Sequence, residues 1–187
     1  MHFYQKIRMN FYQSVHAIVA IYVDDLNLVG TLEELTKIAN CLKNEFEMKD
    51  LGKTKFCLGL QSEHLPNEIL VHQSTYIEKV MKHFYMDKAH PFSTPMVGWS
   101  LGVKKYPFWL QEDDEETLGP EVPYLSAISA LMYLANYTQP NIAFAVILLA
   151  RYSSAPTRSH WNGIKHILCY LRGTIDLGLF YPNGSNQ

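Results

Sequence analysis

Two adjacent carboxylates lie between two runs of strand-forming residues near the start of this sequence. Residues 17–23 (AIVAIYV) and 26–29 (LNLV) are mostly apolar, and they flank Asp24 and Asp25. This pattern predicts a β-hairpin that carries both acids at its turn. An ionised carboxylate beside a buried strand needs hydrogen bonds or a cation to stabilise it. The acids therefore either accept backbone hydrogen bonds in a solvated turn or bind a metal ion.

The rest of the chain predicts helices and short strands. Thr31 and Glu34 form a capping-box pattern at the start of a helix that ends near Gly52. A second such pattern, Thr75 and Glu78, lies at the start of the next helix. Apolar spacing predicts helices at residues 31–52, 73–85, 124–137, 140–151 and 157–173, and strands at residues 54–61, 68–72 and 177–181. This order of elements indicates an α+β fold.

Residues 87–122 lack any periodicity. They hold four prolines and an acidic run, EDDEE, at residues 112–116. That run could bind a metal, but carboxylates between prolines are typical of a solvated loop, and no ligand spacing supports a metal site. We interpret the stretch as a Pro-rich acidic linker. The expected regions are therefore residues 1–86 with the hairpin, the linker at 87–122, and a helical region at 123–187.

The composition excludes several classes of protein. Apolar residues make up 48% and charged residues 18% of the 187-residue chain, as in globular proteins. The net charge of −2 provides no overall basic field, so nucleic-acid binding would need a local patch. Three widely separated cysteines predict neither a zinc site nor a disulfide. No apolar run approaches the roughly 20 residues of a membrane-spanning helix, so we expect an intracellular protein without a membrane partner.

Basic residues recur every seven positions in the last third of the chain, at Arg151, Arg158, Lys165 and Arg172. The last three, here called the basic stripe, lie on one predicted helix. Because seven residues are nearly two helical turns, the stripe would follow one edge of that helix. It either neutralises the phosphates of a nucleic-acid backbone or is the solvated face of an amphipathic helix.

Several ordered motifs resemble those of copia-type retrotransposon polyproteins. Tyr22-Val23-Asp24-Asp25 is similar to the YVDD hairpin of reverse transcriptases. Further similar segments are FEMKDLG at residues 46–52, FCLGL at 56–60, QSTYI at 73–77, STPM at 93–96, LMYL at 131–134, IAFAV at 142–146, PT at 156–157, HW at 160–161 and YLRGT at 170–174. The sequence is therefore identified as similar to a copia-type reverse transcriptase, from the palm hairpin through the thumb or connection region.

This resemblance implies a function in RNA-templated DNA synthesis. The implied fold is a palm-like antiparallel sheet with packed helices, followed by a mainly helical thumb or connection region. Asp24 is the implied direct ligand of Mg²⁺ or Mn²⁺, Asp25 is its catalytic support, and Tyr22 is an implied nucleic-acid contact. The implied partners are an RNA-template and DNA-primer duplex, a dNTP, and the N-terminal reverse-transcriptase and C-terminal ribonuclease H portions. The implied location is a cytoplasmic virus-like particle, or the nucleus.

The sequence also departs from the family pattern. The family's TRPD reads TQPN at residues 138–141 and its YRS reads YLS at residues 124–126, so bidentate recognition by two arginines is lost. Residues 1–23 contain no acid that could replace the aspartate of the family's first palm motif. We therefore expect a fragment that is inactive alone and binds metal weakly. The alternatives are a non-catalytic nucleic-acid-binding remnant or domesticated interaction protein, and a nonfunctional pseudogene product.

Overall fold

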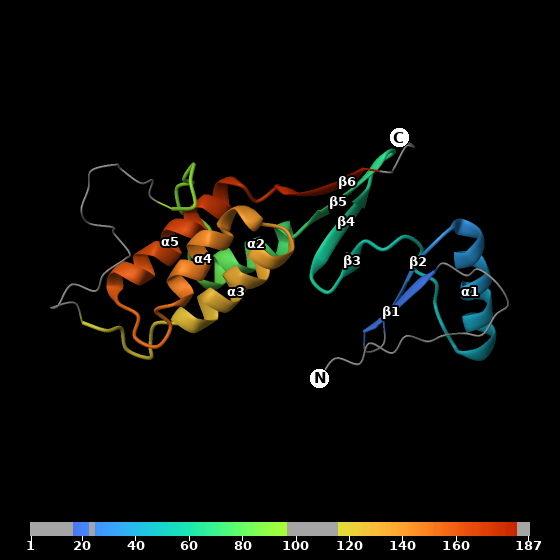
Figure 1. The fold of residues 1–187 in the computed structure, drawn as a ribbon, viewed down its shortest axis with the longest axis horizontal. Helices are drawn as coiled ribbons and strands as arrows, with labels where there is room; N and C mark the ends of the chain where they lie inside the picture. The colour runs from blue at the N-terminus through green and yellow to red at the C-terminus, as the bar shows by residue number, and fades with distance from the viewer. Residues whose placement is uncertain (1–16, 23–24, 97–115, 183–187) are drawn as a thin grey trace. The chain divides into compact units, whose positions relative to one another are not determined.

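The computed structural model describes residues 17–22, 25–96 and 116–182, which contain helices and antiparallel sheets (Figure 1). The predicted α+β class is therefore confirmed. The chain divides into two compact units, Met1–Thr54 and Lys55–Gln187. The boundary between the two units is set by which residues pack together. The regions 1–86, 87–122 and 123–187 rest on sequence pattern and resemblance, and they stay predictions.

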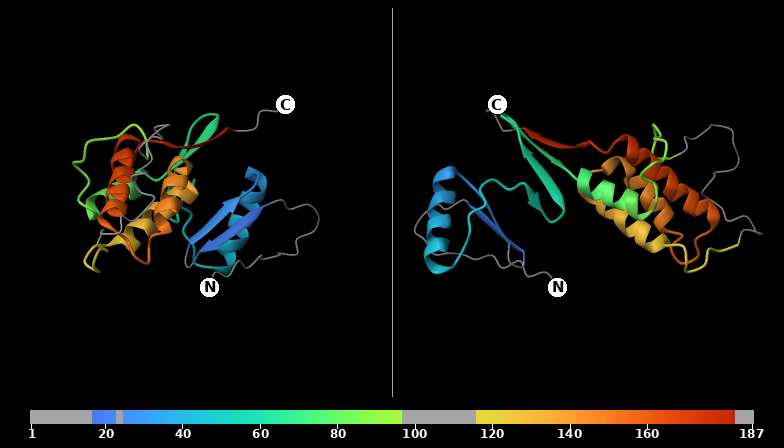
Figure 2. Two further views of the ribbon diagram at one scale, coloured as in Figure 1. Left: turned by 60° about the vertical axis from the view of Figure 1, so that its left-hand side comes forward. Right: turned by 180° about the vertical axis from the view of Figure 1, so that it is seen from behind.

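The first unit is a β-hairpin with a helix beside it (Figure 2). Strands β1 (Ile18–Tyr22) and β2 (Asp25–Val29) pair antiparallel, with Ile18 opposite Val29. Helix α1 (Leu32–Glu45) follows and buries Ile38, whereas Ile18 and Val29 are exposed. A two-stranded sheet with one helix has little apolar surface to bury, so the core of this unit is small.

The predicted capping box is present at the start of α1. The backbone N–H of Glu34 donates to the Thr31 hydroxyl, and the Thr31 N–H donates to the Glu34 carboxylate. The helix ends at Glu45, earlier than the predicted end near Gly52, because the backbone of Phe46 is extended. Gly52 does adopt a left-handed conformation, with φ of 74°, but it lies in the loop beyond the helix.

The sheet of the second unit has the antiparallel order β3-β4-β5-β6. The prediction of one strand at residues 54–61 was wrong. That stretch forms β3 (Phe56–Cys57), a two-residue turn and the start of β4 (Leu60–His64). The turn residues Leu58 and Gly59 both have positive φ, 52° and 78°, as the tight hairpin geometry requires. Strands β5 (Glu68–His72) and β6 (Gly178–Pro182) complete the sheet.

The helices of the second unit surround a common core (Figure 1). They are α2 (Ser74–His83), α3 (Tyr124–Tyr137), the 3₁₀ turn η1 (Pro140–Ile142), α4 (Ala143–Ala150) and α5 (Arg158–Gly173). The second predicted capping box was wrong, because α2 has Gln73 at its N-cap and no side-chain cap, and the Thr75 N–H donates to Gln61 Oε1 at 2.8 Å. None of the described helices is long and apolar enough to cross a membrane.

Candidate functional site

The acid-bearing hairpin is held in a defined register. Tyr22 is the last residue of β1 and pairs with Asp25, the first residue of β2. Asp25 is therefore part of a strand, and Val23 and Asp24 alone connect the two strands. Both connecting residues lie outside the described part of the chain. The sequence that follows Asp25 is anchored by Asn27, whose Oδ1 accepts a hydrogen bond from the Thr54 hydroxyl at 2.9 Å.

Asp50 is another acid of this unit, and both oxygens of its carboxylate have partners. Its Oδ1 accepts a hydrogen bond from the Gly52 N–H at 2.9 Å, and its Oδ2 pairs with Lys43 Nζ at 2.9 Å. The Gly52 N–H, followed by Lys43, holds the pKa of this exposed carboxyl below its ordinary value. Because both oxygens have partners within the unit, Asp50 is a poor candidate for a further metal ligand. Among the described residues no group of three His, Cys, Asp or Glu side chains is arranged to hold a metal ion.

The basic stripe lies on α5. Arg158, Lys165 and Arg172 are all exposed, and they follow one edge of the helix over about 21 Å at the usual helical rise. Within the described ranges none of the three forms an ion pair. Arg151 is exposed at the C-cap of α4 and is not part of this helix. The structure thus brings three of the four predicted basic residues onto one rigid element.

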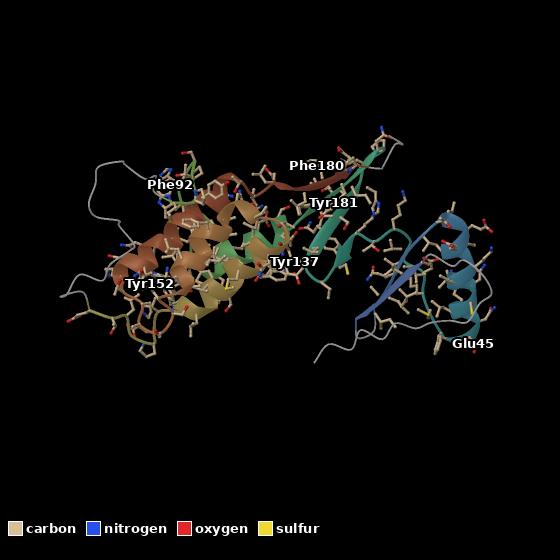
Figure 3. The ribbon with its side chains drawn as sticks, viewed as in Figure 1. Glu45, Phe92, Tyr137, Tyr152, Phe180 and Tyr181 are labelled. Carbon is tan, nitrogen blue, oxygen red and sulfur yellow. The ribbon has the colours of Figure 1, made fainter. Side chains whose placement is uncertain are left out.

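A segment that follows α2 crosses α5 and fixes it. The Phe92 N–H donates to the Cys169 carbonyl at 3.2 Å, and His166 Nε2 contacts the Thr94 carbonyl at 3.1 Å. A Cβ built on Gly173 would lie 3.0 Å from Pro91 Cβ, so a larger residue would crowd the segment. Figure 3 shows Phe92 beside this helix. Within the STPM motif at residues 93–96, the Thr94 carbonyl makes one of these contacts.

The start of α5 is capped by a histidine. Thr157 donates its backbone N–H to His160 Nδ1 at 3.0 Å, and the two side chains are 2.9 Å apart. The Tyr152 ring stacks on the His160 ring at a centroid distance of 3.9 Å. His160 is buried, so the imidazole acts as an internal cap. The helix that carries the basic stripe therefore begins from a rigid N-terminus.

The TQPN turn has an internal role in the structure. Gln139 is 1% exposed, and its Nε2 donates to the Leu177 carbonyl at 3.0 Å. Asn141 donates to the hydroxyl of Tyr170 on α5. The Gln139 side chain thus faces the protein's own main chain, and the loss of bidentate recognition by an arginine at this position stays a prediction. Leu125 of the YLS motif is 61% exposed, and the loss of a surface cation there stays a prediction.

Comparison with known proteins places this geometry in a family. The family model described as reverse transcriptase (RNA-dependent DNA polymerase) matches residues 5–98, about half of the chain. The match includes the hairpin, the sheet strands β3 to β5 and α2. No solved structure gives a significant match.

Curated relatives extend the similarity along most of the chain. The retrovirus-related Pol polyprotein from transposon TNT 1-94 of Nicotiana tabacum is 38% identical over 84% of the chain, which spans 12% of that polyprotein. The retrovirus-related Pol polyprotein from transposon RE2 of Arabidopsis thaliana is 30% identical over 88% of the chain and 11% of the polyprotein. The uncharacterized mitochondrial protein AtMg00810 of Arabidopsis thaliana is 31% identical over 88% of the chain and 65% of that protein. The chain belongs to the copia-type reverse transcriptase family.

Proposed function

We propose that this chain supplies the acid-bearing palm hairpin and the thumb or connection region of a copia-type RNA-directed DNA polymerase. The observation that carries the proposal is the hairpin register, in which Tyr22 pairs with Asp25 and leaves Asp24 in a two-residue connection. A rigid strand pair that ends in acids is a suitable support for a metal site, because it presents carboxylates at the end of a sheet. The helical region at residues 123–187 would then contact the nucleic acid as a thumb.

The donor set fits a divalent metal chemically. Carboxylate oxygens are the hard ligands that Mg²⁺ prefers, and the ion is commonly held by one or two carboxylates together with substrate phosphates. Asp24 would be the direct ligand, and Asp25 would support the connection. When bound, such ions stabilise the attacking and leaving oxygens of a phosphoryl transfer. The role of this chain is to hold the carboxylate at the end of the hairpin.

We further propose that residues 1–187 have no polymerase activity by themselves. Positioning and electrostatic stabilisation provide most of the acceleration in phosphoryl transfer, so a site that lacks a carboxylate and a nucleotide-binding surface should lose several orders of magnitude in rate. Residues 1–23 contain no acid. The chain spans 12% of the TNT 1-94 polyprotein, and the dNTP and the full template-primer duplex would be bound together with the remainder of such a protein.

A second candidate function is non-catalytic nucleic-acid binding. It is favoured by the basic stripe, whose three exposed cations lie on α5. This helix is capped at its start and is held by a hydrogen bond from the segment that follows α2. A fixed row of cations can follow a phosphate backbone without reading its sequence. This function would persist in a chain that has no polymerase activity.

Primer extension separates these functions. The purified chain is incubated with a primed RNA or DNA template, dNTPs and Mg²⁺ or Mn²⁺, and the Asp24→Asn variant is the control. We expect no extension by either protein, together with measurable binding to the template-primer duplex. Extension that depends on Asp24 would contradict the proposed inactivity, and it would mean that another carboxylate or a second copy of the chain completes the site.

A further inference from the structure

A surface groove follows the seam between α2 and α3 in the second unit. Its volume is about 470 Å³, and its lining includes Tyr76, Lys79, His83 and Phe84 from α2 and Ser126 and Ser129 from α3. This volume lies in the range of sites that bind a small ligand or one part of a larger ligand. None of the residues that line the groove belongs to the hairpin or to the basic stripe.

The formal charge in the lining of this groove comes from Lys79. Tyr76, Lys79 and His83 recur at a spacing that places them on one face of α2. Glu78, the acid of this helix, lies about 100° or more around the helix from each of them. No carboxylate is among the residues that line the groove. The groove is therefore complementary to an anion.

The seam also carries a row of tyrosines at one end of the groove. The Tyr76 and Tyr133 rings meet edge to face with centroids 4.9 Å apart, and the Tyr133 and Tyr137 rings are 4.8 Å apart. The Tyr133 hydroxyl is fixed by its hydrogen bond to the Leu58 carbonyl. Tyr137, at the end of α3 (Figure 3), is 47% exposed. Part of its ring is thus available to a ligand while its inner neighbour is held rigidly.

We propose that the α2–α3 seam binds one strand of single-stranded nucleic acid. A phosphate would lie against Lys79 and the hydroxyl of Ser126, and a base further along the strand would stack on Tyr137, which lies about 16 Å along α3 from Ser126 at the usual helical rise. Unpaired bases expose the faces that aromatic side chains stack on, whereas bases in a duplex already stack on each other. The Ser129 hydroxyl donates to the Leu125 carbonyl at 2.8 Å, so it would act toward the ligand as an acceptor. An acidic peptide would bind Lys79 but would leave the tyrosine row unexplained.

The test measures the fluorescence anisotropy of a labelled oligothymidylate of about twelve nucleotides, a length that exceeds the smallest sites for single strands. The exposed positions Lys79 and Tyr137 are changed to Gln and Leu separately, and thermal unfolding verifies that each variant folds. We expect each change to weaken binding at least about fivefold, the lower end of the range for loss of one stacked base. Lys82→Gln, on the same helix but outside the groove lining, and Tyr137→Phe, which keeps the ring, should bind like the unchanged chain.

Three results would overturn this inference. They are an absence of oligothymidylate binding, equal losses in Lys82→Gln and Lys79→Gln, and competition by polyglutamate as effective as competition by unlabelled oligonucleotide. The last result would identify the groove as a site for acidic peptides. Replacement of Arg158, Lys165 and Arg172 by Gln should weaken duplex binding more than single-strand binding. The two measurements therefore distinguish a failure of the proposed function from a failure of the proposed single-strand site at the α2–α3 seam.

Discussion

The hydroxyl group of Tyr133 on α3 donates a hydrogen bond to the main-chain carbonyl of Leu58, 75 positions earlier in the chain. Leu58 and Gly59 form the turn between β3 and β4, and a Cβ built on Gly59 would lie 2.8 Å from the Tyr133 hydroxyl oxygen. The left-handed turn brings its carbonyl to the helix, and the tyrosine fills the space that a side chain at residue 59 would need. This contact fastens the sheet of the second unit to its helices.

Gly59→Ala and Tyr133→Phe should therefore be coupled. Loss of the Tyr133 hydrogen bond should cost about 1 kcal/mol of unfolding free energy. Gly59→Ala should cost more, because a left-handed backbone strains alanine by about 1–2 kcal/mol and the new methyl group meets the hydroxyl. In the double variant the next atom of the ring is 3.7 Å from the Cβ, an ordinary contact. We expect the double variant to lose less than the sum of the single losses in urea unfolding.

Strict additivity of the two changes would contradict this relationship. Tyr137→Phe is the matched control for the loss of a tyrosine hydroxyl on the same helix. It should change stability by less than Tyr133→Phe, because the Tyr137 side chain is about half exposed.

The parts of the fold that local chemistry determines could be predicted from the sequence. The Thr31–Glu34 capping box and the bounds of helix Tyr124–Tyr137 agree with the structure, because capping and apolar spacing are properties of adjacent residues. The β3–β4 turn could not be predicted, because Leu58 is an unusual residue at positive φ. The pairing of β6 with β5 joins segments far apart in the chain, and no local pattern encodes it.

The candidate sites could likewise be predicted only where their residues are close together in the sequence. The hairpin could be predicted because its acids and strands are contiguous, and the basic stripe because it lies on one helix. The face formed by Tyr76, Lys79 and His83 has a spacing that could have been found in the sequence. Its alignment with Tyr133 and Tyr137 depends on how α2 packs against α3, which sequence spacing alone does not determine.

Stability should fall at alkaline pH because of Tyr124. Burial, with a smaller contribution from Tyr152, raises the pKa of the Tyr124 hydroxyl above its ordinary value of 10.0. Above that value the unfolded chain releases the proton while the folded chain retains it, so rising pH favours unfolding. The hydroxyl also donates to the Leu149 carbonyl at 2.8 Å. Tyr124→Phe should be about 1 kcal/mol less stable at neutral pH but should lose less stability above pH 10.

The measurement is urea unfolding at a series of pH values from neutral to about pH 11, a range that crosses the ordinary tyrosine pKa. Tyr85→Phe is the control, because the Tyr85 side chain is 91% exposed. A fall in stability that is equally steep in the unchanged chain and in Tyr124→Phe would assign the alkaline transition to other groups.

Metal binding by the isolated chain should be weak. Two adjacent carboxylates without substrate phosphates or a further acid leave most ligand positions of Mg²⁺ to water. Asp50 offers little help, since Lys43 and the Gly52 N–H occupy its oxygens. Titration calorimetry should show no saturation with Mg²⁺ or Mn²⁺ below about 1 mM. Tight binding that disappears in Asp24→Asn would show that the chain completes the metal site by itself.

The basic stripe should determine how duplex binding depends on salt. Each phosphate that a cation neutralises contributes about 0.9 to the slope of the logarithm of affinity against the logarithm of salt concentration. Changing Arg158, Lys165 and Arg172 together to Gln should therefore flatten the slope by up to about three. The loss should be equal for unrelated duplex sequences, because phosphate contacts do not read bases. Anisotropy titrations of a labelled duplex between about 50 and 200 mM salt measure this slope.

A variant with the same change in charge tests whether the effect belongs to α5. Lys37, Lys43 and Lys49 are exposed residues of the first unit, and two of them already pair with carboxylates, Lys37 with Glu33 at 2.6 Å and Lys43 with Asp50 at 2.9 Å. Because those cations have partners within the protein, changing these three lysines to Gln should alter the slope by less than one. If both triple variants flatten the slope equally, duplex binding follows total charge. If neither does, the stripe is a solvated helix face.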